Sequence, residues 1–139
     1  TTLFRSIFAC GNVLHVHDLV DFVSEEAARA GRNAAKYIRE NGKKSNAPEI
    51  VKFIAGNGVR YTVPCTADIA NIDEEIHLRF RVKNVYKGCS IKVWSGDDVL
   101  ISKKKRITVP SEMEDIILKP EMLKGISGDI TVSIEEGSI

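Results

Sequence analysis

The stretch Ile76-His77-Leu78-Arg79-Phe80-Arg81-Val82-Lys83 alternates apolar and polar side chains without interruption. Successive side chains of a β-strand point to opposite faces of a sheet, so this period of two predicts a strand with one buried face and one polar face. The same period recurs within residues 91–93 and 130–134. The chain after residue 48 is therefore predicted to consist mainly of strands.

Turn sequences divide this part of the chain into short segments. Gly56-Asn57-Gly58 predicts a β-hairpin between the apolar runs on either side of it, and Gly96-Asp97-Asp98 predicts a second turn. The other expected elements are strands at 50–55, 59–63, 92–95, 99–103 and 115–118, and a tight loop or helical turn at 120–125. Seven or eight short strands separated by turns indicate an antiparallel β-sandwich over residues 49–139, which should fold alone.

Residues 19–40 have a different period and predict a long helix. Apolar residues recur there at steps of three and four and form one stripe, as expected of an amphipathic helix that packs on another element. Asp18 is expected to cap the start of the helix, and Gly42 to end it. The stripe consists of Leu19, Val20, Val23, Ala27, Ala30, Ala34, Tyr37 and Ile38.

The segment Ile7-Phe8-Ala9-Cys10-Gly11-Asn12-Val13 precedes this helix. Residues 7–10 are apolar without alternation, which predicts a short strand covered on both faces. A small-residue turn then places Asn12 at its tip, ahead of a helix N-terminus. α/β proteins use this arrangement to hold the polar backbone of a nucleotide cofactor.

The boundaries between these parts follow from composition. Residues 41–48 are rich in Gly, Lys, Ser and Asn and end in proline, and we place a linker at 44–48 between a strand-plus-helix part at 7–43 and the sandwich. Thr1-Thr2-Leu3-Phe4-Arg5-Ser6 fits neither part and matches the translation of a common sequencing adapter. Residues 1–6 are therefore expected to be an artefactual leader.

Phe8, Ala9 and Gly11, with the later run Gly31-Arg32-Asn33-Ala34-Ala35, resemble the C-terminal flavin motif of the FAD-dependent pyridine nucleotide-disulfide oxidoreductases. The resemblance covers residues 7–40. It implies that the strand ends beside the ribityl chain of FAD and that the helix N-terminus points at the isoalloxazine. Asn12 stands where the family carries an acidic residue. The cofactor-binding residues implied by the resemblance are Gly11, Asn12, Asp21, Phe22 and Val23.

The whole chain resembles the C-terminal end of the oxidoreductases of this type found beside anaerobic glycerol-3-phosphate dehydrogenases, which carry a small extra domain after the FAD fold. The resemblance implies an α+β fragment: the last strand and helix of a truncated FAD-binding α/β domain, then an accessory β-domain. Such a fragment is inactive alone and lacks the NAD(P) site. Its expected partners are the remaining FAD and NAD(P) domains and a dehydrogenase subunit. The alternative is a non-enzymatic β-sandwich module for interaction or assembly.

Composition excludes several other classes of protein. Residues 1–46 hold seven Lys or Arg and five Asp or Glu, and residues 47–139 hold thirteen and fourteen, so neither half has the basic excess of a nucleic-acid binder. No apolar run approaches the roughly 20 residues that span a bilayer. The three cysteines, Cys10, Cys65 and Cys89, form no CxxC pair. Free thiols in a reducing compartment, the cytoplasm, are therefore expected.

Four further features are interpreted as parts of the fold or surface rather than as metal-binding or reactive sites. His15-Val16-His17-Asp18 resembles a metal-ligand pattern, but His77 is the one other histidine and is expected on the exposed face of a strand, so we predict no metal site. Cys10 is interpreted as a buried small residue rather than a redox group. Residues 103–106 read Lys-Lys-Lys-Arg, typical of a solvated turn or a protected edge strand. Trp94 is expected in the core or as a small interface anchor.

Overall fold

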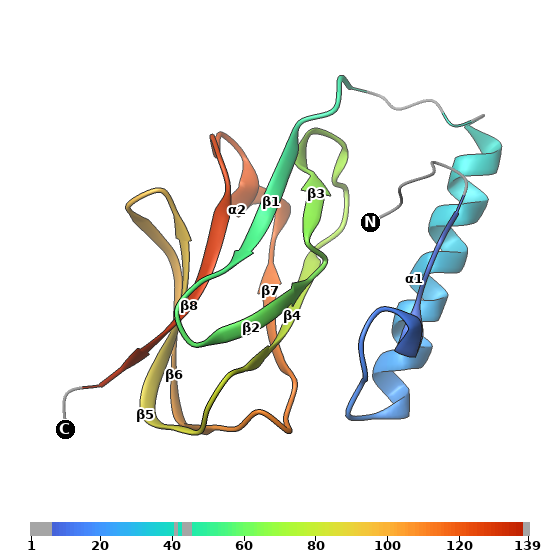
Figure 1. Ribbon diagram of the computed structural model, residues 1–139. Helices are drawn as coiled ribbons and strands as arrows, with labels where there is room; N and C mark the ends of the chain where they lie inside the picture. The colour runs from blue at the N-terminus through green and yellow to red at the C-terminus, as the bar shows by residue number, and fades with distance from the viewer. Residues whose placement is uncertain (1–6, 41, 43–45, 138–139) are drawn as a thin grey trace. The chain divides into compact units, whose positions relative to one another are not determined.

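The computed structural model describes residues 7–40, 42 and 46–137. The chain divides between Pro48 and Glu49 into two compact units. Unit 1 contains one long helix, and unit 2 contains two β-sheets and is made mostly of strands (Figure 1). The predicted leader at 1–6 lies outside the described residues, as do residues 44 and 45 of the predicted linker.

The long helix of unit 1, α1 (Val20–Arg39), has 20 residues and confirms the predicted helix to within one residue at each end. Gly42 has a φ of 68°, and its N–H donates to the carbonyl of Tyr37 at 2.9 Å, which ends the helix as expected. The predicted N-cap is wrong. Leu19 occupies that position with an extended backbone and no side-chain hydrogen bond, so Asp18 lies one residue too early to cap.

Unit 2 contains eight strands in two sheets. The five-stranded sheet has the order β3-β1-β8-β5-β6, and the three-stranded sheet has the order β2-β4-β7. Two short helices, the 3₁₀ helix η2 (Ile69–Asn71) and α2 (Pro120–Leu123), connect strands, and α2 confirms the predicted helical turn. The strands are β1 (Ile50–Ala55), β2 (Val59–Val63), β3 (Thr66–Asp68), β4 (Ile76–Val82), β5 (Tyr86–Ser95), β6 (Asp98–Thr108), β7 (Glu114–Leu118) and β8 (Ile130–Glu136).

One apolar core joins the two sheets in a sandwich-like arrangement. Its members come from both sheets and from α2, and the alternating residues predicted to face inward on β4 are all at most 8% exposed. The same holds for the inward residues of β5 and β8. The largest fully buried side chains are Phe80, Leu78, Ile91, Leu118, Ile130 and Ile134.

The hairpin predicted at Gly56-Asn57-Gly58 is wrong, because β1 and β2 belong to different sheets. The three residues form a corner at which the chain passes from one sheet to the other. Main-chain hydrogen bonds hold the corner: Gly56 N–H donates to Val132 O, Ile134 N–H to Asn57 O, and Lys83 N–H to Gly58 O, each at 2.8 Å. A turn hydrogen bond from Val59 N–H to Gly56 O is present at 3.2 Å, but β1 pairs with β3 and β8 and β2 pairs with β4, rather than with each other.

The sandwich is also not wholly antiparallel. Five of the six strand pairs are antiparallel, but β1 and β8 run parallel, with Phe53 opposite Ile130. The chain between β1 and β8 passes through both sheets before β8 runs beside β1 in the same direction. Parallel neighbours need such a long connection.

The second predicted turn is confirmed. β5 and β6 form an antiparallel hairpin in which Ser95 pairs with Asp98 across Gly96 and Asp97. Lys103, Lys104, Lys105 and Arg106 lie on β6, which is an edge strand of the five-stranded sheet, as the edge-strand interpretation expects. Lys105 Nζ lies 2.8 Å from a carboxylate oxygen of the buried Glu114 on β7.

Gly58 and Gly96 give a matched test of the corner. Both have positive φ, 76° and 57°. A Cβ at Gly58 would lie 2.8 Å from the Ile134 Cβ, whereas a Cβ at Gly96 would meet nothing within 4 Å. We expect Gly96→Ala to cost about 1–2 kcal/mol from backbone strain, and Gly58→Ala to cost about 1–3 kcal/mol more because of the overlap.

Urea unfolding followed by the fluorescence of Trp94, the single tryptophan, measures both variants. Equal losses of unfolding free energy would show that the corner tolerates a side chain and would contradict this account.

Candidate functional site

The residues before α1 fold back along the helix in unit 1 (Figure 1). The ring of Phe8 meets the ring of Tyr37 edge-on, with centroids 6.0 Å apart. Further along, Gly11 reaches the first half of the helix, where its N–H donates to Glu26 Oε2 at 2.6 Å. The segment is thus held to α1 at both ends.

The strand predicted over residues 7–10 is not formed. Cys10 has extended dihedral angles (φ −150°, ψ 164°), but extended backbone becomes a strand only beside a hydrogen-bonded neighbour, and no segment among the described residues pairs with it. A short 3₁₀ helix, η1 (Gly11–Val13), follows at once. Ile7, Phe8 and Ala9 are exposed in this structure, and Cys10 is half-buried.

Gly11 is the most constrained of the predicted cofactor-binding residues. It is buried and has a φ of 73°, a conformation that favours glycine. A Cβ there would lie 3.3 Å from Val23 Cγ1, a tight contact. The glycine therefore allows the loop to approach the first turns of α1.

Asn12 closes the loop that follows. Its side-chain Oδ1 accepts the N–H of His17 at 3.3 Å, although the side chain itself is exposed. The other three predicted residues lie at the start of α1: Asp21 is exposed, and Phe22 and Val23 are half-buried. The structure brings Gly11 to Val23 and leaves Asp21 facing outward.

Two histidines of this loop lie close to a glutamate of α1, and the sequence analysis does not predict this group. His15, His17 and Glu26 each offer a nitrogen or oxygen ligand atom, and these atoms all lie within 4.8 Å of one another. The imidazole centroids are 4.3 Å apart, and His17 Nε2 lies 3.4 Å from Glu26 Oε2. His15 is 7% exposed and His17 is 9% exposed.

Glu26 is the member that sequence reasoning missed. The third histidine, His77, belongs to the other unit, so it cannot complete a ligand set with His15 and His17 within unit 1. A signal was present, because Glu26 follows Val23 by three residues and precedes Ala30 by four. It therefore interrupts the apolar face of the helix with a charge.

His77 lies in a second polar cluster, on β4 of unit 2. Its Nδ1 is 2.8 Å from Asp115 Oδ2 and its Nε2 is 3.4 Å from Glu75 Oε1, and the side chain is 12% exposed rather than fully exposed as expected. Arg79 Nε lies 3.5 Å from the same Asp115 oxygen. The contacts of His77 and Arg79 with Asp115 join β4 to β7, and cross-strand pairs of this kind stabilise a sheet.

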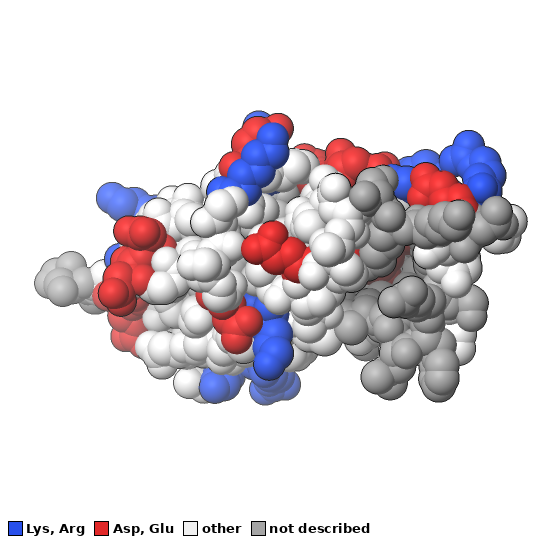
Figure 2. Space-filling model, turned by 90° about the horizontal axis from the view of Figure 1, so that it is seen from above, with Lys and Arg blue, Asp and Glu red and all other residues white. Residues whose placement is uncertain are grey.

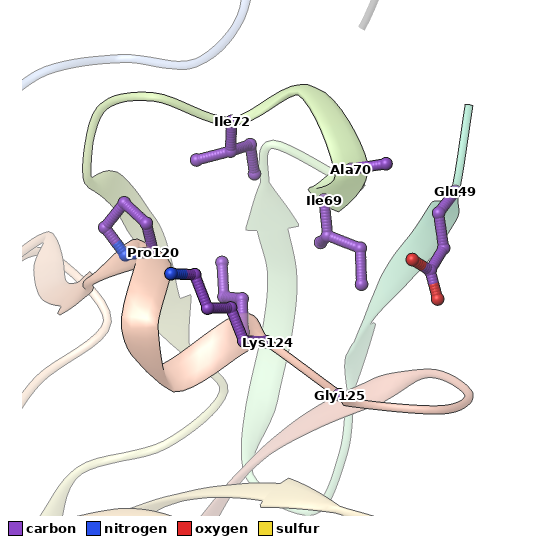
Figure 3. A pocket seen from close by; sticks show the side chains of 8 residues that line it. Glu49, Ile69, Ala70, Ile72, Pro120, Lys124 and Gly125 are labelled. Atoms are coloured by element: carbon purple, nitrogen blue, oxygen red, sulfur yellow. The ribbon is translucent and has the colours of Figure 1, made fainter. Parts of the chain in front are cut away.

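A pocket of about 280 Å³ opens between η2 and α2. Figure 3 shows Ile69 and Ile72 reaching from the η2 segment toward α2, with Glu49 and Lys124 on opposite sides. Glu49 and Lys124 are its two charged residues, and they do not converge. The pocket has too few polar groups to suggest a reaction.

The other features that the sequence singles out give no additional site within the described ranges 7–40, 42 and 46–137. Cys10, Cys65 and Cys89 are all free thiols, and Trp94 is half-buried with its Nε1 donating to Ser133 Oγ at 2.8 Å. On the face in Figure 2, acidic and basic side chains occur in small separate groups.

No helix in the described part of the chain is both long and apolar enough to cross a membrane. Comparison with known proteins finds no matching family model, curated protein or solved structure.

Replacing Glu26 by alanine tests the attachment of the loop. A hydrogen bond to a charged acceptor contributes about 1.5–3 kcal/mol, so we expect the Gly11 amide to exchange with solvent at least about tenfold faster in Glu26→Ala. Hydrogen exchange measured by NMR follows that amide directly. Glu25→Ala changes the neighbouring exposed carboxylate and serves as the control; equal acceleration in both variants would mean that the Glu26 contact does not hold the loop.

Proposed function

We propose that this chain is the C-terminal part of an FAD-dependent NAD(P)H oxidoreductase. In this proposal the segment at 7–40 supplies the last flavin-binding strand and helix, and unit 2 is an accessory β-domain. FAD, when bound, would carry the electrons. The protein residues would position it: Gly11 by close backbone approach, Asn12 by a hydrogen bond to a ribityl hydroxyl, and the start of α1 by its dipole.

The observation that carries the proposal is the incomplete burial of α1. No residue of this helix is buried, and Val20, Ile38 and Leu19 are 75%, 73% and 57% exposed. An amphipathic helix is stabilised mainly by packing of its apolar face. The stripe therefore favours a partner, and the remainder of an FAD-binding α/β domain has the required apolar surface. The same partner would supply the neighbouring strands that residues 7–10 need.

The buried, positive-φ Gly11 at the start of the loop is consistent with this proposal. The fit of the other residues is looser, because Asn12 Oδ1 is bonded within the loop and Asp21 faces outward. The exposed amide of Asn12 remains suitably placed for a polar ligand. Unit 1 by itself has the polar loop but not a surrounding pocket for a flavin among its described residues.

The second candidate function is a non-enzymatic interaction or assembly module. Its support is that unit 2 has a core of its own, with 18 buried hydrophobic residues that come from both sheets, from α2 and from the segment after it. Within the oxidoreductase proposal, this domain would contact a dehydrogenase subunit. Co-purification of a candidate subunit with the protein, but not with a variant lacking residues 47–139, would support that role.

A flavin titration of this chain alone is the first test. We expect no saturable FAD binding, because the described residues do not enclose a cofactor. The fluorescence of the flavin reports its binding, and a dissociation constant in the micromolar range or tighter would contradict the expected lack of binding.

The deciding test extends the reading frame upstream. We expect a Gly-x-Gly-x-x-Gly segment there, and we expect the extended protein to purify with flavin, measured by its visible absorption. In the extended protein Asn12→Ala should lower the flavin content several-fold, whereas Asn84→Ala, which changes an exposed asparagine of unit 2, should not. A reading frame that starts beside residue 1, or an extended protein without flavin, would favour the interaction module.

A further inference from the structure

We propose that His15, His17 and Glu26 form a binding site for a divalent transition metal of the zinc class, with three protein ligands and an open coordination position. The proposal does not depend on the flavin function, since none of the three residues is among those assigned to the cofactor and the metal requires no flavin. The sequence analysis predicts no metal site at the histidine pair. The structure places a third possible ligand, the carboxylate of Glu26, beside the two histidines.

The spacing of the ligand atoms fits such an ion. Zinc binds imidazole nitrogen and carboxylate oxygen at about 2.0–2.2 Å, and tetrahedral geometry then places ligand atoms roughly 3.4 Å apart. His17 Nε2 and Glu26 Oε2 are already 3.4 Å apart. The remaining separations in the group are within 4.8 Å, so metal binding requires the His15 ligand atom to move only a short way toward the other two.

The backbone directs both histidines to the same side. His15 and His17 are buried, while Val16 between them is 63% exposed. Both rings therefore lie on the inner side of the loop, close to Glu26 of α1. Glu26 then approaches from the helix, so the ligands come from a loop and from a rigid element.

Contacts around the ligands hold them in place. Glu26 Oε2 accepts the Gly11 N–H at 2.6 Å, and the main chain of His17 donates to Asn12 Oδ1 at 3.3 Å. Hydrogen bonds of this kind orient ligands in protein metal sites and raise their affinity for the metal. A carboxylate oxygen can accept one hydrogen bond and still offer a lone pair to a cation.

The donor set selects the kind of metal. Two imidazoles with one carboxylate suit zinc and its neighbours in the first transition row, whereas Ca²⁺ and Mg²⁺ prefer oxygen ligands alone. The described part of the chain brings three such residues together. Water would then fill a fourth position, which is the arrangement of zinc sites that act on a substrate rather than of closed structural sites.

The test titrates metal-free full chain with Zn²⁺ by calorimetry and with Co²⁺ by visible absorption. We expect one equivalent to bind with micromolar or tighter affinity, and Co²⁺ to give the intense bands of a tetrahedral site. Glu26→Gln keeps the shape of the side chain and an acceptor for Gly11, but it should weaken Zn²⁺ binding at least tenfold. His15→Ala and His17→Ala should each do the same.

Two matched controls separate this site from general metal binding by histidines and carboxylates. His77→Gln alters the histidine in unit 2, and Glu25→Gln alters the neighbouring exposed carboxylate; both should bind Zn²⁺ as the parent does. The helical circular dichroism of each variant checks that α1 remains folded.

Absence of stoichiometric binding by the parent chain would overturn the proposal. Equal weakening by His77→Gln or Glu25→Gln would do so too. A chain that binds Zn²⁺ tightly would leave the flavin proposal to its own test, because no step of this titration involves FAD.

Discussion

One apolar layer between the two sheets holds unit 2 together. Strands from both sheets contribute side chains to it, and full burial of each large one stabilises the fold by about 1.5–3 kcal/mol. The layer also fixes what faces outward, because an alternating strand that buries Leu78 and Phe80 must turn His77 and Arg79 to its other side. The contacts of His77 and Arg79 with Asp115 are therefore a consequence of the core.

Unit 1 depends on a different kind of contact. Its helix buries no residue, and the loop before it is attached by the carboxylate of Glu26 and by the ring contact of Phe8 with Tyr37. The two proposals assign separate tasks to this unit. The exposed apolar stripe is the surface that a further domain would cover, and the His15, His17 and Glu26 cluster is the place where a cation would bind.

The local sequence pattern predicts most of the helices and strands, but it predicts less well which strands pair with each other. The helix, the strand at Ile76–Val82 and the turn at Gly96 follow from periods and turn residues that act over a few positions. The corner at Gly56 does not, because Gly-Asn-Gly allows either a hairpin or a change of sheet. The carbonyl of Val132 and the N–H of Ile134, more than 70 residues away, bond to this segment and favour the change of sheet over the hairpin. The strand expected before Gly11 is absent for a related reason, since it needs a neighbour.

The amino-acid sequence specifies the long helix, most of the strands and the apolar faces, because these properties depend on side chains that are close along the chain. The tertiary structure sets the rest. It placed β1 and β2 in different sheets, made β1 and β8 parallel, and brought Glu26 to His15 and His17. Each of these depends on how loops and core packing bring distant segments together, and no local period encodes that.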